Sequence, residues 1–194
     1  MRTDHRMAVV DDITMRSTLE ARWAVFFDEL GLSWEYEPER FRFGKLIYTP
    51  DFLLPGLGYV EIKPSLDLFI EQTSNRLKAF SRAFPNKEIY VCLGEGVNLN
   101  ETVKYKGGKI YAPTFLQMAH ALIHARDGKE RHQQNEVLSV ICHAIKRASD
   151  WKANHFVSTG AILALEVIPE TGRCMRKQLA RARSRRQRTY SGHA

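Results

Sequence analysis

Asp51, Glu61 and Lys63 are the residues of this chain whose types and spacing could do chemistry. They stand in the stretch from Tyr48 to Pro64, YTPDFLLPGLGYVEIKP, where most neighbours are apolar. Two carboxylates that are held together repel each other unless one is protonated or a cation sits between them. Hard divalent metals such as magnesium are commonly bound by one or two carboxylates together with phosphate oxygens and water. The pattern therefore points to a divalent-cation site, with a lysine beside it for a phosphate or an attacking water.

A hairpin is expected to bring these side chains together. The cluster Pro55-Gly56-Leu57-Gly58 is typical of a turn between two short strands. If the chain turns about residues 56 and 57, opposed residues have numbers that sum to about 112 or 113. Asp51 then faces position 61 or 62, and Glu61 and Lys63 point to the same side because side chains alternate along a strand. An alternative stays open, in which Asp51 caps a turn and the other two form an ordinary salt bridge.

The elements around the hairpin follow from hydrophobic periodicity. A helix is predicted from Ser17 to a stop at Gly31, with its apolar face formed by Leu19, Trp23, Phe26, Phe27 and Leu30. Three strand-like runs follow, at residues 33–43, 45–54 and 59–64, then a helix over 66–84 and a strand over 88–94. A strand after a crossover helix is usually parallel to a neighbour in the same sheet.

The second half of the chain is predicted to be mainly helical. A hairpin is expected around Gly107-Gly108, followed by helices over residues 114–126 and 135–151 and by a final helical segment. The predicted class is α/β with a mixed sheet and a C-terminal helical extension. We divide the chain into residues 1–112 and 113–194.

The order helix, strand, strand, strand, helix, strand, together with these motifs, resembles the PD-(D/E)xK nuclease superfamily, which has the restriction-endonuclease-like fold. Pro50-Asp51 matches the PD element and Glu61-Ile62-Lys63 matches the ExK element. The resemblance covers roughly residues 16–94. Phrases of the form RSxxE, PDF and VEIKP are similar to phage-type and transposon-type members.

The resemblance implies roles for individual residues in hydrolysis of DNA phosphodiester bonds, leaving a 5′-phosphate and a 3′-hydroxyl. Asp51, Glu61 and the carbonyl of Ile62 would hold Mg²⁺, with Mn²⁺ as a substitute. Lys63 would orient or help deprotonate the attacking water. Glu20, on the first helix, would support a second metal or hold Lys63 in place.

Glu20 also has a purely structural interpretation. The sequence Ser17-Thr18-Leu19-Glu20 is a capping box, in which the glutamate satisfies a backbone amide at the start of the helix. Both interpretations stay open here. Glu71, Gln72 and Lys78, on the helix after the ExK element, are weaker candidates for a further polar site residue.

The positive charge of the chain is concentrated near its C-terminus. Eight Lys or Arg residues lie between Arg173 and Arg188, and no acidic residue follows Glu170. Removing these eight charges from the formal net charge of +7 leaves about −1. Such a block favours polyanions, and the predicted DNA-binding residues are Lys177, Arg181, Arg185 and Arg188. The alternative is a solvated terminus with no specific partner.

Other classes of site are disfavoured. The three cysteines are far apart and indicate neither a disulfide framework nor a zinc site. His120 and His124 are four residues apart, but no third ligand stands near them. No phosphate-binding GxxxxGK[ST] loop occurs. With no long apolar run and no secretory signal, we expect no membrane span and a cytoplasmic location.

The sequence thus supports three hypotheses. The first is a magnesium-dependent DNA nuclease encoded by a phage or another mobile element. The second is a transposon-end endonuclease that acts with a transposase. The third is a DNA-binding or assembly factor that keeps the fold without turnover. A homodimer or a partner protein of a phage or transposition complex is compatible with each of them.

Overall fold

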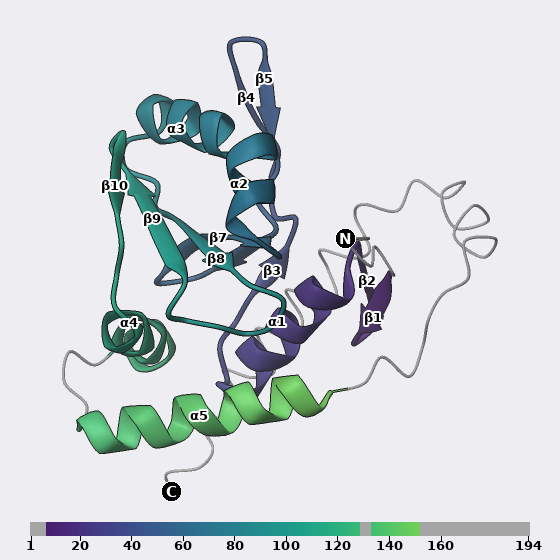
Figure 1. Cartoon of the computed structure of the whole chain (residues 1–194), viewed down its shortest axis with the longest axis vertical. Helices are drawn as coiled ribbons and strands as arrows, with labels where there is room; N and C mark the ends of the chain where they lie inside the picture. The colour runs from purple at the N-terminus through teal and green to yellow at the C-terminus, as the bar shows by residue number, and fades with distance from the viewer. Residues whose placement is uncertain (1–6, 129–132, 152–194) are drawn as a thin grey trace, which may run out of the picture.

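The structure, a computed structural model, describes residues 7–128 and 133–151 (Figure 1). These residues form an α/β fold with ten strands and five helices. In chain order the elements are β1 (Ala8–Val10), β2 (Ile13–Met15), α1 (Thr18–Glu29), β3 (Glu35–Tyr36), β4 (Phe41–Phe43), β5 (Leu46–Tyr48), β6 (Phe52–Leu54), β7 (Gly58–Lys63), α2 (Leu66–Gln72), α3 (Ser74–Ala83), β8 (Ile89–Leu93), β9 (Thr102–Lys106), β10 (Lys109–Tyr111), α4 (Phe115–Asp127) and α5 (Gln134–Asp150). In the part of the chain so described, no helix is both long and apolar enough to cross a membrane.

A six-stranded mixed sheet lies at the centre, in the order β10-β9-β8-β7-β6-β3. β7 and β8 are parallel, as expected for strands joined by crossover helices, and the other neighbours are antiparallel. The expected hairpin around Gly107-Gly108 is confirmed and forms one edge of this sheet.

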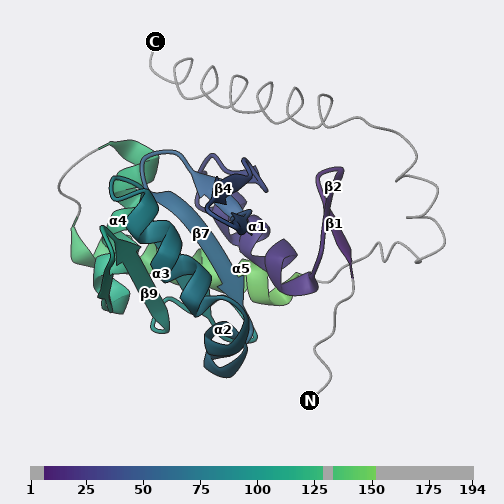
Figure 2. The ribbon, with the colours of Figure 1, turned by 90° about the horizontal axis from the view of Figure 1, so that it is seen from above.

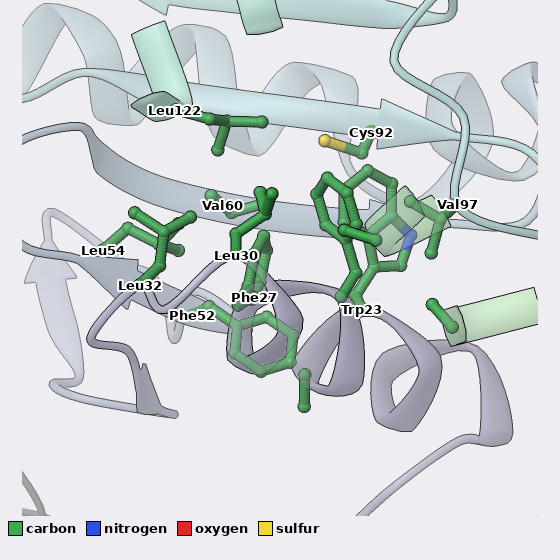
Figure 3. Packing of buried hydrophobic residues seen from close by; sticks show 14 of the residues in the cluster. Trp23, Phe27, Leu30, Leu32, Phe52, Leu54, Val60, Cys92, Val97 and Leu122 are labelled. Atoms are coloured by element: carbon green, nitrogen blue, oxygen red, sulfur yellow. The ribbon is translucent and has the colours of Figure 1, made fainter. Parts of the chain in front are cut away.

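Helices cover both faces of the sheet (Figures 1 and 2). On one side, α1, α4 and α5 enclose an apolar core with Trp23, Phe27 and Phe52 at its centre (Figure 3). On the other side, α2 and α3 cover a smaller core rich in aromatic residues, in which Phe80 is fully buried. The predicted boundary between residues 112 and 113 falls between β10 and α4, and both helices after it pack into the first core.

The predicted number of strands before α2 was wrong. The run over residues 33–43 is divided into β3 and β4, and the run over 45–54 is divided into β5 and β6. Pro38 and Pro50 stand at these breaks; proline cannot donate to a strand ladder, and Glu37 has a positive φ of 45°. As a result, β4 and β5 leave the main sheet and pair only with each other.

Two further elements differ from the prediction. An N-terminal hairpin, β1–β2, was missed; it turns at Asp11 and Asp12, both with positive φ, a conformation that aspartate tolerates in two-residue turns. The single helix expected over residues 66–84 is broken at Thr73, which has φ −127°. By contrast, α1, α4 and α5 lie where periodicity placed them, and Gly31 (φ 71°) follows α1 as predicted.

Candidate functional site

The β6–β7 hairpin places Asp51 and Glu61 side by side. Its pairs are Phe52 with Val60 and Leu54 with Gly58, so paired numbers sum to 112, as predicted. Continuing this register by one residue puts Asp51 opposite Glu61. The backbone ladder has ended there, and the Asp51 carboxylate takes its place by accepting a hydrogen bond of 2.7 Å from the Ile62 amide. Both carboxylates are therefore held on the face of the sheet that α2 and α3 cover.

The ammonium group of Lys63 lies among three oxygen atoms. Its Nζ forms an ion pair of 2.6 Å with Glu61 Oε1 and donates a hydrogen bond of 3.1 Å to the Ile62 carbonyl. Asp51 Oδ2 lies 4.0 Å from the same nitrogen. Burial lowers the pKa of Lys63, but the charges of Asp51 and Glu61 raise it by more, so the group is a cation at neutral pH. A positive charge thus stands where two carboxylates and a carbonyl converge.

Glu61 is almost fully buried, with 4% of its surface exposed. Its Oε2 accepts a hydrogen bond of 2.7 Å from the hydroxyl of Tyr48, which is itself buried. Burial and the nearby charge of Asp51 raise the pKa of Glu61 to about 7, although Lys63 and Tyr48 act in the opposite direction. Burial, followed by the charge of Glu61, raises the pKa of Tyr48, so its hydroxyl remains a donor. Glu61 therefore holds a proton more readily than an exposed glutamate does.

Arg16, just before α1, connects Asp51 to the first helix. Its Nη2 donates a hydrogen bond of 2.6 Å to Asp51 Oδ1, and its Nε lies 3.1 Å from Glu37 Oε1. The guanidinium is about half exposed, whereas Asp51 is only 1% exposed. An unpaired buried carboxylate would cost several kcal/mol, and Arg16 and Lys63 supply the partners of the Asp51 carboxylate inside the protein.

Glu20 lies next to this cluster, not within it. Its Oε2 accepts hydrogen bonds from the Tyr36 hydroxyl at 2.5 Å and from the Arg16 amide at 3.1 Å. Burial and the charge of Asp51 raise the pKa of Glu20. Burial and the charge of Glu20 likewise raise the pKa of Tyr36, which keeps its proton and donates.

Only half of the expected capping box at the start of α1 is present. Ser17 is the N-cap, and its hydroxyl accepts a hydrogen bond from the Glu20 amide. The Glu20 carboxylate, however, accepts from the amide of Arg16, one residue before the cap. Glu20 therefore connects the start of α1 to Tyr36 and to Arg16, the residue that binds Asp51. It acts partly as a capping residue and partly as a neighbour of the site.

The remaining sequence candidates lie away from the cluster or outside the described residues. Glu71, Gln72 and Lys78 are exposed on α2 and α3. His120 is half-buried and His124 is exposed on α4. The predicted DNA-binding residues Lys177, Arg181, Arg185 and Arg188 lie outside the described part of the chain.

Three contact residues, Arg16, Tyr36 and Tyr48, were missed by sequence reasoning. Arg16 could have been noticed, since it opens the RSTLE phrase that carries part of the family resemblance. The two tyrosines gave no local signal, because each one reaches a carboxylate more than ten residues away in the sequence.

The donor set of the cluster suits a hard divalent ion only in part. Across residues 7–128 and 133–151, no group of three or more His, Cys, Asp or Glu side chains is placed to hold a metal. The oxygens that surround Lys63 Nζ come from Asp51, Glu61 and the Ile62 carbonyl. All are hard ligands, and magnesium often takes only one or two carboxylates and completes its shell with water and phosphate. The residues therefore fit Mg²⁺ or Mn²⁺ if the ammonium group of Lys63 moves away from the point where these oxygens converge.

We compared the chain with protein-family models, with curated proteins and with solved structures, and none of the comparisons found a match. The likeness to PD-(D/E)xK nucleases consequently depends on the residues of the hairpin and of α1, and it stays a prediction.

Replacing Glu61 with glutamine should stabilise the metal-free protein at alkaline pH. The pKa of Glu61 is about 7 when folded, against an ordinary value of 4.5, so the folded state binds more protons between these pH values. The free energy of unfolding of the wild type therefore falls as pH rises from 4.5 to 7. The variant escapes this loss, and at pH 8 its free energy of unfolding should be higher than that of the wild type by roughly 3 kcal/mol.

Urea unfolding in EDTA at pH 5 and pH 8 measures this effect. The difference in free energy of unfolding between Glu61→Gln and wild type should shrink at pH 5. Glu136→Gln, at an exposed position, is the control, and its free energy of unfolding should match that of the wild type at both pH values. A Glu61→Gln protein that is less stable than wild type at pH 8 would show that the ion pair with Lys63 outweighs the cost of burial.

Proposed function

We propose that this protein is a magnesium-dependent DNA nuclease of the PD-(D/E)xK type, with a restriction-endonuclease-like core. The observation that carries the proposal is the position of the Lys63 ammonium, with oxygens of Asp51, Glu61 and Ile62 around it. Two buried carboxylates and a backbone carbonyl converge on this one point, and such hard oxygen atoms are the ligands that a divalent cation would take.

Asp51, Glu61 and the Ile62 carbonyl would hold the ion. When bound, it stabilises negative charge on a phosphoryl oxygen and favours ionisation of a bound water. The chain itself contributes rigidity, because the Ile62 amide and Arg16 fix the two oxygens of Asp51 in place. Tyr48 fixes the second oxygen of Glu61 in the same way.

Lys63 supplies a protonated amine beside these carboxylates. Because its pKa is raised above the ordinary value, it acts in this state as a hydrogen-bond donor and a positive charge. Both roles suit phosphodiester hydrolysis, in which negative charge develops on the phosphoryl group and must be stabilised. Glu20 and Tyr36 would act through Arg16, as positioning residues.

A plasmid assay tests the proposal. The full-length protein should convert supercoiled DNA to nicked or linear forms with Mg²⁺ or Mn²⁺, and EDTA should abolish the conversion. Nicks should be resealed by DNA ligase, which requires the 5′-phosphate and 3′-hydroxyl ends expected of this chemistry. Folded protein that binds DNA but cuts nothing with either metal would instead support the assembly-factor hypothesis. Cleavage that appears only with a transposase present would support the transposon-end role.

A further inference from the structure

The β4–β5 hairpin, which we call the ribbon (Phe41–Tyr48), lies apart from the six-stranded sheet (Figure 1). One of its faces is anchored to α3. The Phe41 ring packs edge-on against Phe80, with ring centroids 4.8 Å apart, and the Phe43 ring lies 5.8 Å from the same residue. Aromatic contacts of this kind contribute about 0.5–1.5 kcal/mol each beyond the area they bury. The ribbon is therefore a fixed part of the molecule.

The opposite face and the tip of the ribbon carry positive charge. Arg42 points away from the flanking phenylalanines because side chains alternate along a strand, and it is exposed. Arg40, just before β4, and Lys45, in the turn, are exposed as well. Among the described residues, none of these three cations has an ion-pair partner, and no acidic residue occurs from position 40 to position 48.

The acidic residues that precede the ribbon are already engaged. Glu39 pairs with Lys87 at 3.2 Å and accepts a hydrogen bond from the Tyr59 hydroxyl. Glu37 pairs with Arg16. The positive charge of the ribbon is thus not neutralised by its neighbours. It is also a local feature, since the chain outside the segment from 173 to 188 has a net charge of only about −1.

The ribbon is joined directly to the candidate site. β5 ends at Tyr48, whose hydroxyl donates to Glu61 at 2.7 Å and whose ring lies 5.3 Å from that of Phe80. Only Thr49 and Pro50 stand between Tyr48 and Asp51. A polyanion bound along the ribbon would therefore be held at a set position relative to the two carboxylates.

We propose that the ribbon binds duplex DNA through its phosphates and presents the duplex to the site, an inference that rests on the proposed function. The major groove of duplex DNA, about 12 Å wide, admits a two-stranded ribbon, so cations on the ribbon can approach the phosphates that border the groove. Contacts from arginine and lysine to phosphates fix orientation without reading bases. Arg40, Arg42 and Lys45 consequently position the substrate and confer little sequence preference.

The test compares two double variants of the full-length protein. Arg42→Ser with Lys45→Ser removes ribbon charge, and Lys109→Ser with Lys146→Ser removes two exposed cations from β10 and α5 as a matched control. Binding of a fluorescent DNA duplex is followed by anisotropy in EDTA over a range of salt concentrations. The ribbon variant should bind about 10-fold more weakly at 0.1 M salt. Its slope of log affinity against log salt should fall by up to about 1.8, because two phosphate contacts are lost.

Unchanged affinity and slope in the ribbon variant would overturn the inference, as would an equal loss in the control. Thermal unfolding checks that each variant is folded. If a double variant does not fold, the single variants Arg40→Ser and Arg42→Ser replace it, and the slope of log affinity against log salt should fall by about 0.9 in each of them. Plasmid cleavage separates the two proposals. Wild-type protein that shows ribbon-dependent binding but never cuts DNA refutes the nuclease and leaves the ribbon contact standing. Wild-type protein that cuts DNA, with binding that does not depend on the ribbon, supports the nuclease and refutes the ribbon contact.

Discussion

Replacing Lys63 with methionine should lower the rate of magnesium-dependent DNA cleavage by about 10²- to 10⁴-fold while the protein stays folded. Methionine keeps much of the apolar stem but removes the charge and the donor that face Glu61 and the Ile62 carbonyl. Folding should survive because Glu61, whose pKa Lys63 lowers, can take up a proton once its partner is gone. The loss would therefore belong to chemistry and not to stability.

Single-turnover nicking of supercoiled plasmid measures this effect, with thermal unfolding recorded on the same preparations. Lys78→Met is the matched control, because Lys78 is an exposed lysine on α3 and was itself a weaker candidate for the site. Cleavage by Lys63→Met at the wild-type rate would remove the lysine from the reaction and, with it, the main support for the proposed function.

Changing Asp51 to asparagine should lower cleavage by at least about 100-fold and weaken binding of divalent metal. An asparagine oxygen can still accept from the Ile62 amide, so the local backbone should be preserved. The negative charge that binds Arg16 and that would bind the metal is lost. Because Asp51 raises the pKa of both Glu61 and Glu20, these two carboxyls should ionise at lower pH in the variant.

Metal binding measured without DNA distinguishes this prediction from a general loss of activity. Calorimetric titration with Mn²⁺, in the absence of DNA, should show weaker binding by Asp51→Asn, whereas exposed Asp150→Asn should match the wild type. If Asp51→Asn bound Mn²⁺ as tightly as wild type, Asp51 would not be a ligand, whatever the variant did to cleavage.

The charges of the site explain how the fold accommodates two buried carboxylates. Asp51 and Glu61 are buried together, and Lys63 and Arg16 provide the compensating positive charge. The pKa of Glu61 nevertheless stays raised, mainly because the group is buried and secondly because of the charge of Asp51. Burying the two carboxylates together is therefore a cost in stability, and under the proposed function a bound divalent cation would reduce it.

The central pair of the site was predictable because its geometry is local. A glycine-rich turn at residues 55–58 fixes the register of a hairpin, and alternation along a strand then decides which side chains share a face. Both effects act within about a dozen residues, so Asp51, Glu61 and Lys63 could be placed together from their spacing. The same holds for α1, α4 and α5, whose apolar periodicity reflects the core they face.

The separation of β4 and β5 from the main sheet was decided by tertiary structure. Alternation predicts strands over residues 33–54, but it does not say which strand pairs with which. Packing of Phe41 and Phe43 on α3 competes with pairing in the sheet, and prolines at 38 and 50 allow the chain to leave it.

The partners of the carboxylates were likewise decided only by the tertiary structure. The amino-acid sequence by itself determined an α/β fold and a hairpin that joins two acids and a lysine. It did not determine that Arg16 would reach Asp51 across 35 positions or that Tyr48 would reach Glu61 across 13. Contacts between segments so far apart depend on how whole elements pack, because the burial of apolar faces, and not the spacing of the polar residues, brings them together.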